Sequence, residues 1–133
     1  MNPPPWRWVG EAVVLAIHDE QIADHGGAAG VRDLLLVQSA LARPMNLAAY
    51  GAPDVAGLAA AYAFGIVRNH GFVDGNKRTA FVVAAVFLLD HGYALVAGDE
   101  EAVRVMVRLA AGEIEEDELA EWIRKHIQIE TGD

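Results

Sequence analysis

Residues 69–80 read Asn-His-Gly-Phe-Val-Asp-Gly-Asn-Lys-Arg-Thr-Ala and connect two apolar helical patterns. Within nine positions the stretch places a histidine, an acid and two adjacent cations: His70, Asp74, Lys77 and Arg78. The two cations fall in the first turn of the second helix, where the positive partial charge of the helix end disfavours them. A bound anion removes this cost, so the stretch predicts a phosphate site at a helix N-terminus.

The loop between the two helices adds a base and a metal ligand to this site. Gly71 and Gly75 allow a tight bend that brings main-chain N–H groups close to a ligand. His70 continues the apolar stripe of the preceding helix toward the same cleft, and an imidazole can accept a proton from a hydroxyl near neutral pH. Asp74 can hold the Mg²⁺ that neutralises the phosphates of a nucleotide.

Each of these residues also has a plainer interpretation. A histidine at a helix end is more often a solvated or capping residue than a base. Asp74 can simply offset the helix dipole, and Asn76 can act only as an N-cap. These interpretations account for the acid and the amide, but not for two cations in the first turn.

The two helices that flank the loop are the most clearly patterned part of the chain. The first is predicted over residues 54–69, with Asp54 as its N-cap. Its buried face is predicted to hold Val55, Leu58, Ala59, Tyr62 and Ile66. The second, over residues 76–91, is apolar nearly all round, which places it in the middle of a bundle.

Four further helices are predicted from apolar spacing and capping residues. A helix that starts at Asp33 ends at Arg43, because Pro44 follows, and residues 45–53 are expected to be irregular. Residues 93–97 form a short extended link. The remaining helices span about 5–24, 99–111 and 115–127, and the buried stripe of the first is predicted to hold Val9, Ala12, Val13, Ala16 and Ile17. We therefore expect a single all-α domain over residues 1–133, a compact six-helix bundle.

Composition excludes several classes of protein. The 133 residues include no cysteine, so disulfides, thiolate metal sites and cysteine nucleophiles are excluded. The formal net charge of −9 argues against a broad surface for nucleic acid or anionic membrane. The longest apolar run, Ala80–Leu89, is about half the roughly 20 residues that cross a bilayer, and no secretory signal is visible. We expect a cytoplasmic protein without membrane or direct nucleic-acid contacts.

The other histidines and the tryptophans are given structural roles. His18, His25, His91 and His126 show no spacing typical of metal ligands, so we expect them at the surface or at helix ends. Trp6, Trp8 and Trp122 are expected to pack as core or edge aromatics.

The stretch from His70 to Arg78 resembles the motif of the Fic/Doc family, H-x-F-x-[D/E/N]-[A/G]-N-x-R. The six matching positions are His70, Phe72, Asp74, Gly75, Asn76 and Arg78. Where the main Fic branch has a glycine this chain has Lys77, and residues 76–80 reproduce the N-K-R-T-A form of the death-on-curing (Doc) branch. Residues 30–44 also look like a segment that Doc-type proteins carry upstream. The resemblance implies a six-helix fold with the active-site loop between the third and fourth long helices.

The resemblance also implies an activity and a role for each matched residue. Doc-type members pass the γ-phosphate of ATP to a hydroxyl of a translation elongation factor, whereas the Fic branch transfers AMP. By matched position, His70 is the base, Asp74 the Mg²⁺ ligand and Phe72 a structural anchor of the loop. The phosphates are assigned to Gly75, Asn76, Lys77 and Arg78. No self-inhibitory motif is visible, so the resemblance implies a toxin that a separate, Phd-like antitoxin blocks.

Three alternatives to a Doc-type phosphotransferase remain. An AMP-transferase would have to tolerate Lys77, although a lysine side chain fills the space that a glycine leaves for the α- and β-phosphates. A catalytically silent module would only bind an antitoxin or regulate its operon. A helix-turn-helix DNA-binding protein is disfavoured by the acidic balance and by the absence of a basic recognition helix.

Overall fold

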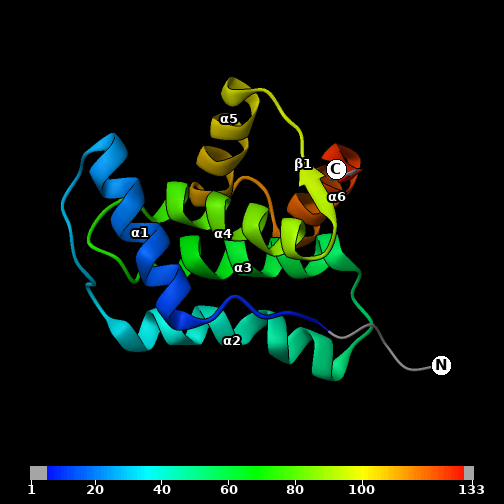
Figure 1. Ribbon diagram of the computed structural model, residues 1–133, viewed down its shortest axis with the longest axis horizontal. Helices are drawn as coiled ribbons and strands as arrows, with labels where there is room; N and C mark the ends of the chain where they lie inside the picture. Colours follow the sequence, from blue (N-terminus) through cyan, green and yellow to red (C-terminus); the bar gives the residue numbers. More distant parts are fainter. Residues whose placement is uncertain (1–5, 131–133) are drawn as a thin grey trace.

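The structure, a computed structural model, describes residues 6–130 (Figure 1). Six helices and two short strands occur in these residues: α1 (Glu11–His25), α2 (Leu34–Tyr50), α3 (Val55–Asn69), α4 (Asn76–Asp90), β1 (Tyr93–Leu95), α5 (Asp99–Ala110), α6 (Glu116–His126) and β2 (Ile127–Ile129). In Figure 1, α3 and α4 lie side by side in the middle, and the other helices surround them. The predicted mainly helical bundle is confirmed, and the loop with the candidate site joins α3 to α4.

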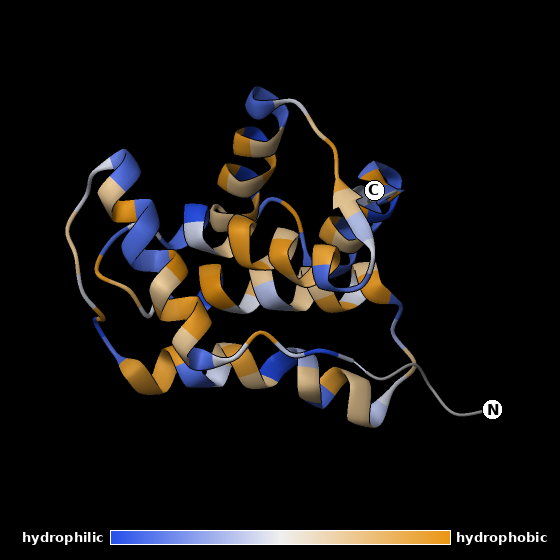
Figure 2. Ribbon diagram, in the orientation of Figure 1, coloured by the Kyte–Doolittle hydropathy of each residue, from blue (hydrophilic) through white to orange (hydrophobic). Residues whose placement is uncertain are grey.

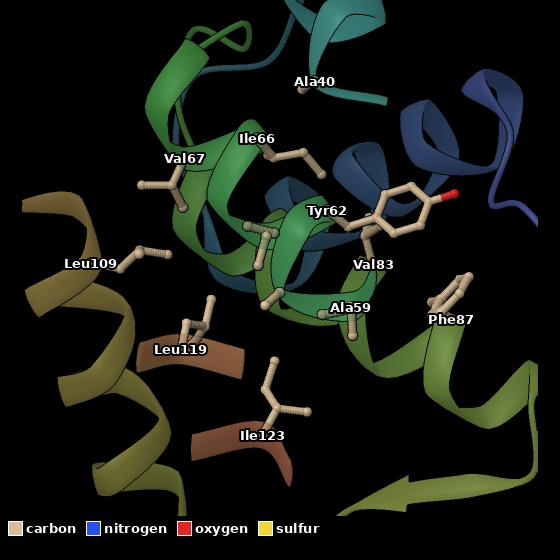
Figure 3. Packing of buried hydrophobic residues seen from close by; sticks show 14 of the residues in the cluster. Ala40, Ala59, Tyr62, Ile66, Val67, Val83, Phe87, Leu109, Leu119 and Ile123 are labelled. Carbon is tan, nitrogen blue, oxygen red and sulfur yellow. The ribbon is translucent and has the colours of Figure 1, made fainter. Parts of the chain in front are cut away.

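α3 is the centre of the core because its small residues let neighbouring helices come close. Ten of its fifteen residues are buried, including alanines at positions 56, 59, 60, 61 and 63. Figure 3 shows Leu109 of α5 and Leu119 and Ile123 of α6 reaching toward α3, on the side away from Ala40 of α2. In Figure 2, apolar colour predominates on α3 and α4. Within residues 6–130, no helix combines the length and the apolar character needed to cross a bilayer.

The first helix differs from its prediction in its start and in its buried face. Trp6–Gly10 are not helical, and Pro5 lies outside the described residues. The buried side chains of α1 are Val14, His18 and Gln21, whereas Val13 is 48% exposed. Apolar spacing selects the wrong face because two of the three buried side chains are polar.

The segment before α1 is extended because it packs across the bundle. Trp6 and Trp8 lie on the ring of Phe87, with ring centroids 6.3 and 6.1 Å apart. The N–H of Val9 donates to the hydroxyl of the buried Tyr62 at 2.8 Å. The expected packing of the tryptophans is confirmed, since Trp6, Trp8 and Trp122 are all partly buried against the core.

Pro44 does not end α2, which continues to Tyr50 and includes most of the segment expected to be irregular. A proline inside a helix leaves the carbonyl four residues earlier without its N–H donor. That carbonyl, of Ala40, faces Gly65 of α3, where an added Cβ would stand only 3.1 Å from the oxygen. α2 thus approaches α3 closely at Ala40, the residue whose carbonyl loses its helical hydrogen bond to the proline.

The predicted extended link forms one strand of a two-stranded sheet, and the last helix ends one residue before its predicted end at residue 127. β1 is extended, as expected, but it pairs antiparallel with β2, so that Tyr93 lies opposite Ile129 and Leu95 opposite Ile127. α6 ends at His126 for the same reason. The pairing joins segments more than thirty residues apart, and local periodicity carries no sign of it.

Asp54 begins α3 and also ties it to α6. Its Oδ1 accepts from the N–H of Gly57 at 2.9 Å, which confirms it as the N-cap. Arg124 donates from Nε and Nη2 to the two carboxylate oxygens at 2.7 and 2.9 Å. The hydrogen bonds from Arg124 hold the pKa of the Asp54 carboxyl below its ordinary value of 3.8.

Replacing Asp54 with asparagine keeps a capping oxygen but removes the ion pair. We expect the free energy of unfolding at pH 7 to fall by roughly 0.5 kcal/mol, because both partners are about half exposed and water screens them. A pKa that is lowered in the folded state stabilises the fold above the pKa of the unfolded chain, and this stabilisation is lost as the pH falls through the folded value. Urea unfolding of both proteins at decreasing pH should therefore show their stabilities converging in acid. A difference that stays constant with pH would contradict the ion pair as its source.

Candidate active site

The loop between α3 and α4 lines a cavity of about 460 Å³ together with the C-terminal end of α1. Figure 1 shows the loop beside α1, at the end of the molecule away from the sheet. The cavity is lined by His25, Gly26, Gly27, His70, Asp74, Gly75, Asn76, Lys77 and Arg78. Every residue predicted for the site except the buried anchor Phe72 thus lies on one cavity.

His70 is held in an unusual backbone conformation at the end of α3. Its φ of 50° and ψ of 49° are left-handed, and no other non-glycine residue among residues 6–130 has a positive φ. This conformation costs about 1–2 kcal/mol, so neighbouring groups must maintain it. Arg32 donates from Nε to the carbonyl of His70 at 2.8 Å and from Nη2 to that of Asn69 at 3.2 Å. The guanidinium of Arg32 thereby bonds two carbonyls at the C-terminal end of α3, where the chain turns toward the cavity.

Asn76 connects the loop to the ring of His70. Its Oδ1 accepts from the N–H of Phe72 at 3.1 Å, and its Nδ2 donates to the carbonyl of Phe72 at 3.0 Å. These two bonds fix the orientation of the amide, so the other Nδ2 hydrogen points at Nδ1 of His70, 3.1 Å away. Nδ1 is therefore the acceptor, and a neutral His70 ring carries its proton on Nε2.

The structure restricts how Asn76 could contact a phosphate. The residue is 7% exposed, and its amide is engaged with Phe72 and His70. Only its main-chain N–H remains for an anion, because Gly75, and not Asn76, occupies the N-cap position of α4.

Replacing Asn76 with alanine should lower the free energy of unfolding by roughly 2–4 kcal/mol. The N–H and carbonyl of the buried Phe72 would both lose their partner, at about 1–3 kcal/mol each. Denaturant unfolding measures the loss. Tyr62→Phe is the comparison far from the loop: it removes a hydroxyl that accepts from the N–H of Val9 at 2.8 Å and donates weakly to its carbonyl at 3.5 Å, and it should cost about 1–2 kcal/mol. Equal losses for the two variants would contradict a double role for Asn76.

The carboxylate of Asp74 is oriented by main-chain N–H groups. Oδ1 accepts from Gly75 at 2.8 Å and Oδ2 from Ala28 at 3.2 Å. The bonds from Gly75 and Ala28 keep the pKa of this carboxyl below its ordinary value of 3.8, and the charges of Arg78 and Lys77 act in the same direction. Gly27 allows the close approach, because a Cβ there would stand 2.7 Å from Oδ2. Asp74 is thus an exposed, ionised group on the cavity wall.

The first turn of α4 presents unused donors and two cations. None of the main-chain N–H groups of residues 76–78 donates to an acceptor within residues 6–130, and no side chain caps this helix end. Arg78 is anchored, because its Nη2 donates to the carbonyl of Gly26 at 2.9 Å. Lys77 is exposed on the cavity wall. The arrangement favours an anion at this end of α4.

Comparison with known proteins identifies the family of this site. A profile of the Fic/DOC family matches residues 8–88, which include α1, α3, the loop and most of α4. The chain belongs to the Fic/Doc family. "Protein kinase doc" of Escherichia phage P1 is 31% identical over 120 residues, which cover 90% of this chain and 94% of that protein. "Toxin Doc" of Mycolicibacterium smegmatis is 44% identical over 75 residues, which cover 54% of this chain and 57% of that protein. As the N-K-R-T-A form predicts, the chain is a Doc-type member.

The chemistry of the Fic/Doc motif would suit a Mg²⁺ ion held by Asp74 together with the phosphates of a nucleotide. Among residues 6–130 no group of three or more acidic or histidine side chains could hold a metal by itself. Mg²⁺ commonly binds through one or two carboxylates together with phosphate oxygens and water. The exposed, ionised Asp74 beside the cationic turn of α4 suits that arrangement.

The structure adds residues to the Fic/Doc site that motif reading did not find. Gly26 and Gly27, which follow α1, form one wall of the cavity and contact the motif residues Arg78 and Asp74. Arg32 and Asp33 lie at the start of the predicted second helix and have different roles. Asp33 is the N-cap of α2, whereas Arg32 supports His70. His25 lies at a helix end, as expected, but on the cavity, and His18 is buried against the loop, contrary to expectation.

Proposed function

We propose that this protein is a toxin that transfers the γ-phosphate of ATP to a serine or threonine hydroxyl of a translation elongation factor and so arrests translation in the cytoplasm. A Phd-like antitoxin on a separate chain would hold it inactive. The observation that carries the proposal is the first turn of α4, where Lys77 and three free main-chain N–H groups meet on the cavity with His70 and Asp74.

The phosphates of ATP bind at the N-terminus of α4 in this proposal. The N–H groups of residues 76–78, Lys77 and Arg78 hold the negative charge that spreads over the transferred group. Mg²⁺ on Asp74 supplies further charge neutralisation when it is bound. The protein therefore contributes mainly position and electrostatic stabilisation, as is general for phosphoryl transfer.

His70 takes the proton of the attacking hydroxyl. The hydroxyl oxygen forms a bond to the γ-phosphorus, the bond from that phosphorus to the β-bridging oxygen breaks, and ADP leaves. Because Nε2 of the neutral ring already carries a proton, the lone pair that accepts the proton is the one on Nδ1, and protonation of Nδ1 ends its 3.1 Å contact with the Asn76 amide. Release of the proton to solvent restores it.

Lys77 favours phosphate transfer over AMP transfer. Its side chain occupies the position on the cavity where a glycine would leave room for the α- and β-phosphates, and it offers a point charge. The name "Protein kinase doc" of the relative matched over most of its length supports the same choice. The name "Toxin Doc" supports the biological role.

Intact-mass analysis of a purified translation elongation factor, incubated with this protein, ATP and Mg²⁺, tests the proposal. We expect one added phosphate, and none when ATP is omitted or when a chelator removes Mg²⁺. An added AMP, which is several times heavier, would replace the kinase by an AMP-transferase. An unmodified factor, together with growth arrest that survives loss of His70, would indicate a silent antitoxin-binding module.

A further inference from the structure

His18 is a buried histidine to which the proposed chemistry gives no task. It lies in the middle of α1 and is 1% exposed. Histidine is buried less often than the apolar residues. When a histidine is buried, its ring nitrogens need hydrogen-bond partners. The partners of His18 belong to the loop that carries the Fic/Doc motif.

Two contacts join His18 to that loop. Its Nε2 lies 2.8 Å from the carbonyl oxygen of Asp74, and because a carbonyl can only accept, Nε2–H is the donor. Its ring stacks on Phe72 with centroids 3.9 Å apart and planes 10° from parallel. One turn further along α1, Ile22 lies against Gly75, where an added Cβ would stand 3.1 Å from Cδ1 of Ile22. The face of α1 that begins at His18 is thus fitted to the loop.

The bond to the Asp74 carbonyl acts on the metal-binding carboxylate through a single peptide plane. The carbonyl of Asp74 and the N–H of Gly75 belong to the same planar group, so one cannot turn without the other. The N–H of Gly75 is the donor that holds Oδ1 of Asp74 at 2.8 Å. Gly75 is in the left-handed region, with φ of 76°, where the loop could otherwise reorient easily.

We propose that His18 is a positioning residue for the Mg²⁺ ligand Asp74. By fixing the plane of the peptide between Asp74 and Gly75, it keeps the carboxylate aimed at the nucleotide phosphates and so sets the affinity for the metal–nucleotide complex. This inference rests on the proposed function, because it takes Asp74 as the metal ligand. Loss of a group that orients a metal ligand typically lowers metal affinity or activity by about 10–100-fold.

The test measures metal binding without turnover. Mn²⁺ binding is followed by electron paramagnetic resonance, in the presence of a non-hydrolysable ATP analogue, for the wild type and for His18→Phe. Phenylalanine keeps a ring on Phe72 but cannot donate to Asp74. We expect Mn²⁺ affinity to fall roughly tenfold and kcat to fall by a similar factor, with the KM for the elongation factor unchanged. His18→Gln, which has a donor near the position of Nε2, should recover most of the affinity.

His91→Phe is the matched control. His91 also stacks on a phenylalanine, Phe87, at 4.3 Å and also contacts a main-chain carbonyl, through Nδ1 at 2.7 Å, but it lies far from the cavity. Its replacement should leave Mn²⁺ affinity unchanged, whatever it costs in stability. Should His18→Phe fail to fold, His18→Met, an adaptable side chain without a donor, takes its place.

The Mn²⁺ affinities of the variants show whether His18 positions Asp74. Wild-type Mn²⁺ affinity in a folded His18→Phe or His18→Met protein would overturn it, as would an equal loss in His91→Phe. Failure of the proposed function gives a different result, because the wild type would then transfer no phosphate to the elongation factor. The Mn²⁺ measurement still separates the His18 variants in that case.

Discussion

Replacement of His70 by alanine is expected to lower the rate of phosphate transfer by roughly 10²–10⁴-fold, the usual contribution of a positioned base. The KM for ATP should change little, because the charges that hold the phosphates come from the first turn of α4. Single-turnover measurement of phosphate transfer to the elongation factor separates the rate of the chemical step from binding.

A second substitution distinguishes chemistry from backbone strain. His70 has φ of 50°, which alanine tolerates poorly, whereas asparagine adopts the left-handed region more readily. His70→Asn should therefore fold at least as well as His70→Ala and yet be equally inactive. His126→Ala, which removes a histidine from the end of α6, should retain activity. Transfer within a few-fold of the wild type in both His70 variants would remove the base from the mechanism.

Replacement of Lys77 by methionine or glycine is expected to lower phosphate transfer by roughly 10²–10³-fold, as loss of a group that stabilises developing charge typically does. The two variants differ in how much of the cavity beside the helix end they leave empty. Methionine preserves the length of the side chain, so Lys77→Met should form no AMP adduct. Lys77→Gly opens the cavity beside the helix end, and we expect the mass spectrum of the elongation factor to show traces of AMP. AMP adducts with Lys77→Met would contradict the steric part of the explanation.

Lys77→Met should have an opposite effect on stability. A cation in the first turn of a helix opposes the helix dipole, so Lys77→Met is expected to stabilise the nucleotide-free protein by about 0.3–1 kcal/mol. Lys125→Met, in the last turn of α6 where a cation is favourable, is the matched control and should be neutral or slightly destabilising. Thermal unfolding without ATP compares the three proteins. A less stable Lys77→Met would show that Lys77 has a structural partner.

Local chemistry explains which elements could be predicted. Asp33 and Asp54 are the N-caps of α2 and α3, as predicted, because a cap depends only on the next three residues. α4 follows its pattern to within one residue for a similar reason, since its apolar residues are continuous in the sequence. The motif loop was located correctly because two glycines and a polar run separate two strong helical patterns.

The errors come from contacts between distant segments. Pro44 lies inside α2, and the carbonyl that it leaves unbonded, that of Ala40, faces Gly65 of α3; a local rule that ends helices at proline does not include such packing. The face of α1 was misjudged because His18 and Gln21 are buried polar residues, and apolar periodicity assigns such residues to the surface. Strand β2 was not predicted, because its partner strand lies more than thirty residues earlier in the chain.

Sequence patterns are enough to identify the family, the loop with its histidine, acid and two cations, and the helix end that these residues share. These features depend on residues within nine positions of one another, so side-chain chemistry and spacing are sufficient to read them. The folded chain is needed to see that the Asn76 amide bonds the loop and His70, that Arg32 donates to the carbonyl of His70, and that His18 contacts the carbonyl of Asp74. A hydrogen bond acts over about 3 Å. Only folding brings His18 that close to Asp74, and Arg32 that close to His70.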